Sequence, residues 1–146
     1  MNVVIVGCGR TGSRLAMQLS SEGNEVTLID RNPAAFSTAQ ARGMLPADFP
    51  GNIVVGDGTD TDLLRRAGIE HADSFVALTE GDNRNIMASQ IAQVVYQVPK
   101  VVCKINDPIR MEIYRKLGMQ IYSPTITGVQ VVREILDQPN GRIPRS

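Results

Sequence analysis

Short apolar segments alternate with stretches of helical periodicity along most of the chain. The apolar segments predict six strands, over residues 2–6, 25–30, 53–55, 74–78, 100–105 and 119–122. Between them, apolar residues recur three or four positions apart, as they do in amphipathic helices. Strands that alternate with helices are typical of a parallel sheet with helices on both faces. We therefore expect an α/β fold with a doubly wound, six-stranded parallel sheet.

Residues with capping preferences mark several helix ends. Asn32 followed by Pro33 predicts the start of a helix after the second strand. Asp107 is a candidate cap for the helix after the fifth strand. In that helix, apolar residues recur every four positions, at Ile109, Ile113 and Leu117. The last helix is expected from Pro124 to about Asp137.

Right-handed crossovers favour the strand order 3-2-1-4-5-6 for such a sheet. Ligands bind beyond the carboxyl ends of the strands, where this order reverses between strands one and four. The polar motifs of the chain follow strand ends: the glycine-rich turn, Asp30, Asp57, Thr79 to Asn83, and Lys104 to Asp107. The sequence therefore predicts a ligand site at this edge of the sheet.

The turn after the first strand reads GCGRTG, with glycines at 7, 9 and 12. This G-x-G-x-x-G spacing between a strand and a helix is the dinucleotide-binding fingerprint of Rossmann-type folds. Gly7 permits the turn, Gly9 lets the backbone approach a pyrophosphate, and Gly12 lets the helix pack against the strand. The free N–H groups at the helix start then face the anion.

An acidic residue ends the second strand, as the fingerprint requires. Asp30 follows Gly12 by eighteen residues (30 minus 12), close to the expected ~20. Its carboxylate can accept both hydroxyls of an adenosine ribose and would repel a 2′-phosphate, which disfavours NADP. Arg31 follows directly and can accommodate such a phosphate, so this exclusion is incomplete. Ribose recognition is common to NAD(H), ATP, ADP and AMP, and these ligands remain alternatives.

Composition excludes several classes of protein. The chain has 146 residues, of which 42% are hydrophobic and 21% charged, and this suits one globular domain. A formal net charge of zero argues against nucleic acid as the main partner. No apolar run reaches the ~20 residues of a membrane helix. The chain enters its first strand directly, without a signal-like segment, and we expect a cytoplasmic protein.

The two cysteines are expected to be free thiols. Cys8 lies in the glycine turn and Cys103 in the fifth strand. The proposed strand order puts one strand between theirs, a separation of ~10 Å, which is beyond disulfide reach. Free thiols fit a reducing compartment. Cys8 is either a redox sensor or a small residue in a tight turn, and the latter is favoured because nothing nearby marks a depressed pKa.

The motifs together resemble one family. They are GCGRTG, Asp30, GDGTD at 56–60, ALTEGDNRN at 77–85, KINDP at 104–108 and a proline before the last helix. This order resembles the RCK-N domain, also called KTN or TrkA-N, the N-terminal nucleotide-binding domain of potassium-transport regulators. The resemblance implies one such domain over residues 1–137 and a mobile tail over 138–146. Family regulators usually continue into a second ligand-binding domain, and the sequence leaves open whether this chain is a single-domain member or an excised part.

The resemblance also implies roles for individual residues. The glycine turn would hold the phosphates through Gly7, Cys8, Gly9, Arg10, Thr11 and Gly12. Asp30 would hold the adenosine ribose with Arg31 beside it. Asp57 and Gly58 would flank the adenine. Thr79, Asp82 and Asn83 would approach the phosphates or the second half of the ligand. Lys104 replaces the family's usual arginine, which keeps the charge and loses the bidentate fork.

The function implied by the resemblance is regulation. The domain would bind NAD(H), or alternatively ATP, ADP or AMP, and pass its state to a membrane potassium channel or transporter. The alternative from another class is a small NAD-dependent oxidoreductase. The single histidine, His71, lies in a polar stretch, and no zinc cluster or nucleophile triad is present. A vestigial structural domain is a third reading, disfavoured by the intact glycine turn and Asp30.

The last helix carries more apolar surface than one packed face needs. One stripe contains Ile126, Val129, Val132 and Leu136, and a second contains Val131 and Ile135. A helix lying on a sheet needs a single stripe ~100° wide. Either this broad face packs into the fold, for example against the preceding helix, or it contacts a second copy. The resemblance implies a homo-oligomer, a dimer or a larger ring, on the inner face of the membrane.

Overall fold

The six expected strands form one parallel sheet in the order β3-β2-β1-β4-β5-β6. This computed structural model describes residues 1–139. The strands are β1 (Asn2–Val6), β2 (Glu25–Asp30), β3 (Asn52–Val55), β4 (Ser74–Ala77), β5 (Lys100–Lys104) and β6 (Gln120–Tyr122). The predicted fold class and strand order are therefore confirmed.

Helices connect the strands in the expected places. They are α1 (Arg10–Ser21), α2 (Pro33–Ala41), α3 (Thr61–Arg66), α4 (Asp82–Gln90), α5 (Pro108–Lys116) and α6 (Pro124–Leu136). A short 3₁₀ turn (Ile69–His71) precedes β4, and a π-helical turn (Ile91–Val95) extends α4. Asn32 and Asp107 cap α2 and α5, since their side chains accept hydrogen bonds from the N–H groups of Ala34 and Ile109.

For three strands the range predicted from the sequence is one residue longer than the strand in the structure. Leu78, Ile105 and Met119 lie just outside β4, β5 and β6. All three side chains are nevertheless buried. The apolar pattern continues past the strand because these residues pack into the core beyond the last paired position.

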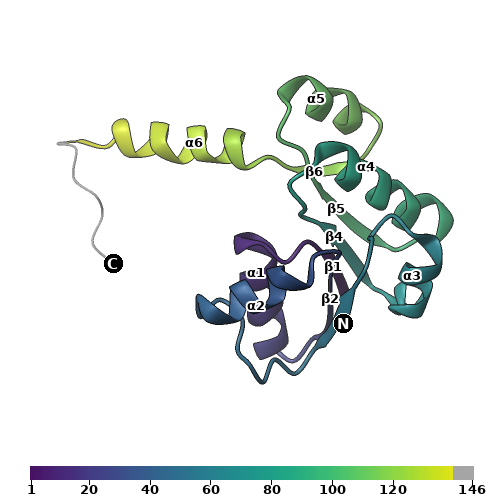
Figure 1. Ribbon diagram of the computed structural model, residues 1–146. Helices are drawn as coiled ribbons and strands as arrows, with labels where there is room; N and C mark the ends of the chain where they lie inside the picture. Colours follow the sequence, from purple (N-terminus) through teal and green to yellow (C-terminus); the bar gives the residue numbers. More distant parts are fainter. Residues whose placement is uncertain (140–146) are drawn as a thin grey trace.

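The sheet divides the core into two layers. Along β1, Val4 and Val6 face the cluster that contains Phe75 and residues of α3 and α4. The alternate residues Val3 and Ile5 face the opposite cluster, which includes residues of α1 and α2. Figure 1 shows α1 and α2 on one side of the sheet and α3 and α4 on the other. This arrangement leaves the carboxyl edge, where α1 and α4 begin, open to solvent.

The apolar stripe of α5 faces outward. Ile109, Ile113 and Leu117 are 74%, 52% and 73% exposed. The contacts of α5 with the core come instead from Met111 and Tyr114, on another side of the helix. The periodicity therefore predicted the helix correctly without indicating which face packs.

The last helix leaves the body of the domain. α6 extends away from the sheet in Figure 1, and none of its residues is buried. Val129, Val132 and Leu136 are exposed on one stripe and Val131 and Ile135 on the other. The alternative in which the broad face of α6 packs into this fold is therefore wrong for this structure. The expected mobile tail lies outside the described residues from position 140 onward.

The two cysteines are not joined by a disulfide bond, as expected. Cys8 and Cys103 are both buried free thiols, and β4 lies between β1 and β5 in the sheet. Within residues 1–139, no helix combines the length and the apolar character needed to cross a membrane.

Candidate nucleotide-binding site

The glycine turn sits where the strand order reverses. Gly7 has φ +112°, and a Cβ there would lie 2.7 Å from the carbonyl carbon and oxygen of Leu78. The Gly7 N–H donates a 2.7 Å hydrogen bond to the Ile29 carbonyl oxygen. The turn thus contacts the ends of β2 and β4 together, and only glycine fits there.

The other two glycines have different surroundings. A Cβ on Gly12 would lie 1.8 Å from the Gly7 carbonyl oxygen, so α1 packs directly on the turn. A Cβ on Gly9 would meet nothing within 4 Å. Gly9 is the residue before α1, and no side chain caps this helix. The first N–H groups of α1 therefore open onto free space, where an anion can accept them.

Asp30 is fixed against this turn. Its Oδ2 accepts a hydrogen bond from the Cys8 N–H at 2.8 Å, and its Oδ1 accepts one from the Asn32 N–H at 2.9 Å. Each carboxylate oxygen keeps further acceptor capacity. The carboxylate can therefore accept ribose hydroxyls without moving.

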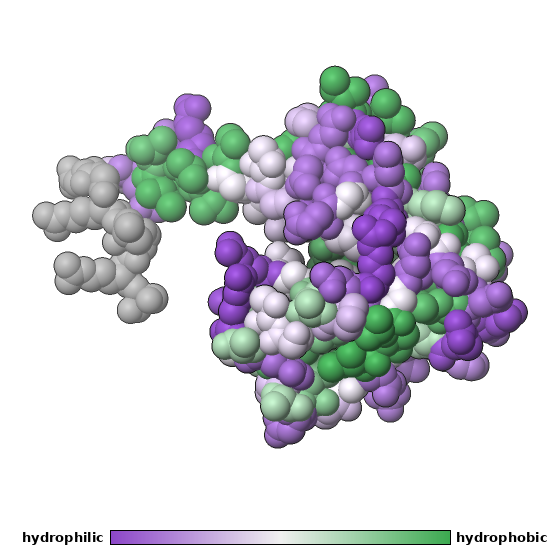
Figure 2. Space-filling view, in the orientation of Figure 1, coloured by the Kyte–Doolittle hydropathy of each residue, from purple (hydrophilic) through white to green (hydrophobic). Residues whose placement is uncertain are grey.

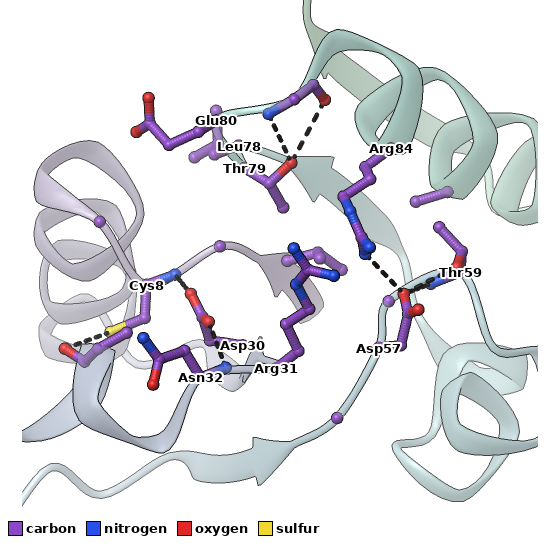
Figure 3. Close-up of a pocket in the computed structure, with 18 residues that line it drawn as sticks. Cys8, Asp30, Arg31, Asn32, Asp57, Thr59, Leu78, Thr79, Glu80 and Arg84 are labelled. Carbon is purple, nitrogen blue, oxygen red and sulfur yellow. Dashed lines mark hydrogen bonds and ion pairs between the residues drawn. The ribbon is translucent and has the colours of Figure 1, made fainter.

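Asp57 anchors the opposite wall of the site. Its Oδ1 accepts hydrogen bonds from the N–H (2.9 Å) and hydroxyl (2.7 Å) of Thr59, and lies 3.4 Å from Nη1 of Arg84. The Thr59 N–H and hydroxyl hold the pKa of Asp57 below its ordinary value, with smaller contributions from Arg84 and Arg31 against the opposing effect of burial. Figure 3 shows Arg31 and Arg84 reaching toward the same part of the pocket from opposite sides.

Asn85 organises the loop after β4. It is completely buried, and its Oδ1 accepts from the N–H and hydroxyl of Thr79 at 2.8 and 2.7 Å. Its Nδ2 donates to the carbonyl oxygens of Thr79 and Lys104 at 2.9 and 3.0 Å. One fully bonded amide therefore joins the ends of β4 and β5.

These elements enclose a cavity of about 320 Å³ beside the glycine turn. Eight of the predicted site residues line it: Gly7, Cys8, Gly9, Asp30, Arg31, Asp57, Gly58 and Thr79. Uncapped backbone N–H groups, the Asp30 carboxylate and two arginines meet in one place. The cavity suits a ligand with an anionic end and a hydroxylated sugar.

A second cavity of about 500 Å³ adjoins the first. Arg10, Thr11 and Lys104 line it, and Cys8 and Gly9 belong to both cavities. The predicted residues of the glycine turn and β5 thus lie along one continuous surface.

Three predicted site residues line neither cavity. Gly12 is packed beneath the turn. Asp82 accepts hydrogen bonds from the N–H groups of Asn106 and Asp107 at 2.8 and 2.9 Å, so it holds the start of α5. Asn83 accepts from Arg110 at 2.7 Å. The structure therefore places Asp82 and Asn83 between α4 and α5, outside the walls of both cavities.

Sequence reasoning missed Arg84 and Glu80 as lining residues. Both follow strand β4 closely, and Arg84 lies in the first turn of α4, whose start faces the carboxyl edge. That position relative to the strand end was the available signal. Asn32 was assigned only a capping role, and it also lines both cavities.

The surroundings of Cys8 favour a packing role over a role as a redox sensor. Burial, with a smaller effect of the Asp30 charge, raises the pKa of its thiol to about 11. A thiol that stays protonated is a poor nucleophile and a poor redox sensor.

The sequence profile of the TrkA-N domain matches residues 3–124. The chain belongs to the TrkA-N domain family. It is similar to the Trk system potassium uptake protein TrkA of Streptomyces coelicolor, with 42% identity over 99% of this chain and 61% of the relative. A TrkA homolog of Methanothermobacter thermautotrophicus is 31% identical over 95% of this chain and 62% of its own. The chain spans about three-fifths of the length of these relatives.

Solved structures share the fold of this TrkA-N domain at low identity. The TrkA-N domain of the inner membrane protein ybaL from Escherichia coli has a TM-score of 0.77 and 15% identity, covering 93% of this chain and 96% of that one. GsuK bound to ADP has a TM-score of 0.73 and 23% identity, covering 93% and 34%. The GsuK channel bound to NAD has a TM-score of 0.65 and 20% identity, covering 84% and 21%.

Proposed function

We propose that this TrkA-N domain binds an adenine nucleotide, either NAD(H) or one of ATP, ADP and AMP, and thereby regulates a membrane potassium channel or transporter. The observation that carries the proposal is the 2.8 Å hydrogen bond from the Cys8 N–H to Asp30. It brings a ribose-binding carboxylate into contact with a phosphate-binding turn, as dinucleotide-binding folds require.

The residues take the roles that follow from this placement. The open N–H groups at Gly9 and the start of α1 bind phosphate, and Asp30 binds the adenosine ribose. Asp57, which lies across the first cavity from Cys8 (Figure 3), and Gly58, which lines the same cavity, would flank the adenine. The solved structures of GsuK with NAD and with ADP support ligands of this kind.

Regulation accounts for the site better than catalysis. His71 is exposed and lies at the amino edge of the sheet, where its carbonyl oxygen accepts a hydrogen bond from Asn2 at the start of β1. The cavities lie at the carboxyl edge, so this histidine is not placed to act as general acid or base on a substrate that exchanges hydride with a nicotinamide bound there. The curated relatives named as potassium uptake proteins support a transport partner.

The proposal extends to location and assembly. A regulator of a membrane transporter acts from the cytoplasm, at the inner face of the membrane, and residues 1–137 form the nucleotide-binding domain. Apolar side chains of α5 and α6 are exposed, and Figure 2 shows apolar surface over both helices. We infer that the domain forms a homo-oligomer through helices near its C-terminal end, and that the bound nucleotide alters how subunits meet.

Isothermal titration with AMP tests nucleotide binding. The Asp30→Asn variant exchanges a carboxylate oxygen for an amide donor, and we expect affinity to fall roughly ten- to hundredfold. Asp73→Asn is the matched control, because Asp73 also accepts a backbone N–H bond, from Asn2 at 2.7 Å, at the opposite edge of the sheet. Equal AMP affinity in the wild-type and Asp30→Asn proteins would contradict the assigned site.

A further inference from the structure

Two arginines approach each other inside the first cavity. Arg31 directly follows β2 and Arg84 lies in the first turn of α4, and they enter the pocket from opposite sides (Figure 3). Arg84 is paired with Asp57, with 3.4 Å between Nη1 and Oδ1. Arg31 takes part in none of the five ion pairs found within residues 1–139. Its guanidinium group is therefore available to a ligand that enters between the two side chains.

The charges around this cavity do not favour an anion between the two arginines. Two cations line the cavity, Arg31 and Arg84, and so do three carboxylates, those of Asp30, Asp57 and Glu80. Negative charges thus outnumber positive ones, and one of the arginines already has a carboxylate partner. A neutral group of a ligand fits between the guanidinium groups better than a phosphate does.

Apolar side chains lie beside the same two arginines. Val6, Leu78 and Ala88 line the cavity together with them. Val6 also packs against Gly58, where a Cβ would collide with its methyl groups. Apolar side chains next to planar guanidinium groups favour an aromatic ring, because the ring can bury its faces without leaving a polar group unpaired.

The base of a bound nucleotide would reach this part of the cavity. In a nucleotide, the base and the phosphates are attached to opposite sides of the ribose ring. With the phosphates at Gly9 and the ribose at Asp30, the base lies on the far side of the ribose, toward Arg31 and Arg84. An oxidised nicotinamide ring fits there poorly, because it is cationic and would meet two more positive charges.

We propose that Arg31 and Arg84 clamp the adenine ring between their guanidinium groups, and that the ion pair with Asp57 positions Arg84 for this contact. The inference rests on the proposed nucleotide binding and adds a residue of α4 that recognises the base. A guanidinium group stacks on an aromatic face through cation–π attraction and through its flat shape. A lysine at the same position keeps the charge and loses the flat group.

Titration with AMP, and competition of ribose 5-phosphate against AMP, test the clamp in the wild-type, Arg84→Lys and Arg115→Lys proteins. Ribose 5-phosphate has the ribose and phosphate of AMP and lacks the base. Arg115 is the matched control, because it is an exposed arginine paired with a carboxylate, that of Glu112 at 2.9 Å, and lines neither cavity. Arg84→Lys should weaken AMP binding roughly three- to thirtyfold and leave ribose 5-phosphate binding unchanged. Arg115→Lys should change neither.

Arg31→Lys tests the other side of the clamp, and we expect a loss of AMP affinity of the same size. Unchanged AMP affinity in Arg84→Lys or in Arg31→Lys overturns the clamp and leaves nucleotide binding intact. A loss of ribose 5-phosphate affinity as large as that of AMP also overturns it, because Arg84 would then act on the ribose or the phosphate. If ribose 5-phosphate does not compete, the AMP affinities of Arg84→Lys and Arg115→Lys decide alone. Failure of AMP to bind the wild-type protein would instead overturn the proposed function.

Discussion

Arg84 of α4 and Asp57, which follows β3, form an ion pair across one wall of the first cavity, with 3.4 Å between Nη1 and Oδ1. The other four ion pairs within residues 1–139 each lie inside one helix or at its end, three or four positions apart. This pair joins segments 27 residues apart. Both side chains are about two-fifths exposed, at 39% and 44%, so solvent screens their attraction. The pair matters for the shape of the site more than for stability.

The pKa of Asp57 should depend on its contacts with Thr59 and Arg84. The Thr59 hydroxyl alone contributes more than Arg84 to lowering the pKa of Asp57. Thr59→Val removes this hydroxyl and keeps the backbone N–H bond, so it should raise that pKa more than Arg84→Gln does. A pKa lower in the folded than in the unfolded state gives stability that is present above the unfolded value, ~3.9, and is lost as pH falls through the folded pKa. Carbon-13 NMR of the carboxyl groups measures both variants. A larger rise in Arg84→Gln would contradict this ranking.

Substitutions at two glycines of the turn should affect different properties, the stability of the fold in one case and the affinity for AMP in the other. Gly12→Ala places a Cβ against the Gly7 carbonyl oxygen, and we expect a loss of roughly 3 kcal/mol or more in unfolding free energy. Gly9→Ala meets no protein atom within 4 Å, so the fold should keep nearly its full stability while AMP affinity falls. Denaturant titration and calorimetric binding of both variants check this. Normal AMP binding by a folded Gly9→Ala protein would show that the phosphates lie elsewhere.

The sequence predicted the parts of the site that depend on strand order alone. The glycine turn and Asp30 end adjacent strands, so a correct topology brings them together. Arg84 and Asn85 were missed because their directions depend on the rotation of α4, which sequence spacing leaves undetermined. The same limit explains α5, whose stripe of Ile109, Ile113 and Leu117 has the spacing of a core face and points outward. Asp82 and Asn83 were assigned to the ligand from their position in a motif, and their hydrogen bonds join them to the start of α5.

Asn85 and Ser89 give a matched pair of buried polar residues in α4, both completely buried. Asn85→Ala leaves the Thr79 N–H and the Lys104 carbonyl without their partner, and should lower the unfolding free energy by about 2–5 kcal/mol. The Ser89 hydroxyl lacks a well-formed hydrogen bond within the described residues, and its polar neighbour is the thiol of Cys103. Ser89→Ala should therefore be neutral or stabilising by up to about 1 kcal/mol. Chemical denaturation measures both, and comparable losses would refute the contrast.

NADP(H) should bind more weakly than NAD(H). The Asp30 carboxylate is held toward the turn by two N–H groups and would meet the 2′-phosphate of NADP(H) with like charge. Competition against a fluorescent adenine nucleotide measures the two potencies. In Asp30→Asn the difference should shrink, because the repulsion is removed. Equal potency in the wild-type protein would mean that Arg31 neutralises the phosphate.

Assembly is the last prediction, and it rests on α6. This helix has no buried residue, and its exposed apolar side chains form two stripes rather than one. A solvent-exposed helix of this composition leaves a large apolar area in water, which favours association. A second copy of the chain is the partner we expect.

Light scattering measures this association with and without nucleotide. Val132→Asp and Ile135→Asp each put a charge on one of the two stripes, and both should shift the protein toward monomer. Gln130→Asp is the matched control, because Gln130 is an exposed polar residue of the same helix. Since α6 makes few contacts with the domain, the variants should keep their thermal stability as monomers.

If nucleotide state sets how subunits meet, adding ATP or NAD should change the measured mass or the dissociation constant. A wild-type monomer at micromolar concentration, unaffected by Val132→Asp or Ile135→Asp, would refute the interface and leave the nucleotide site standing.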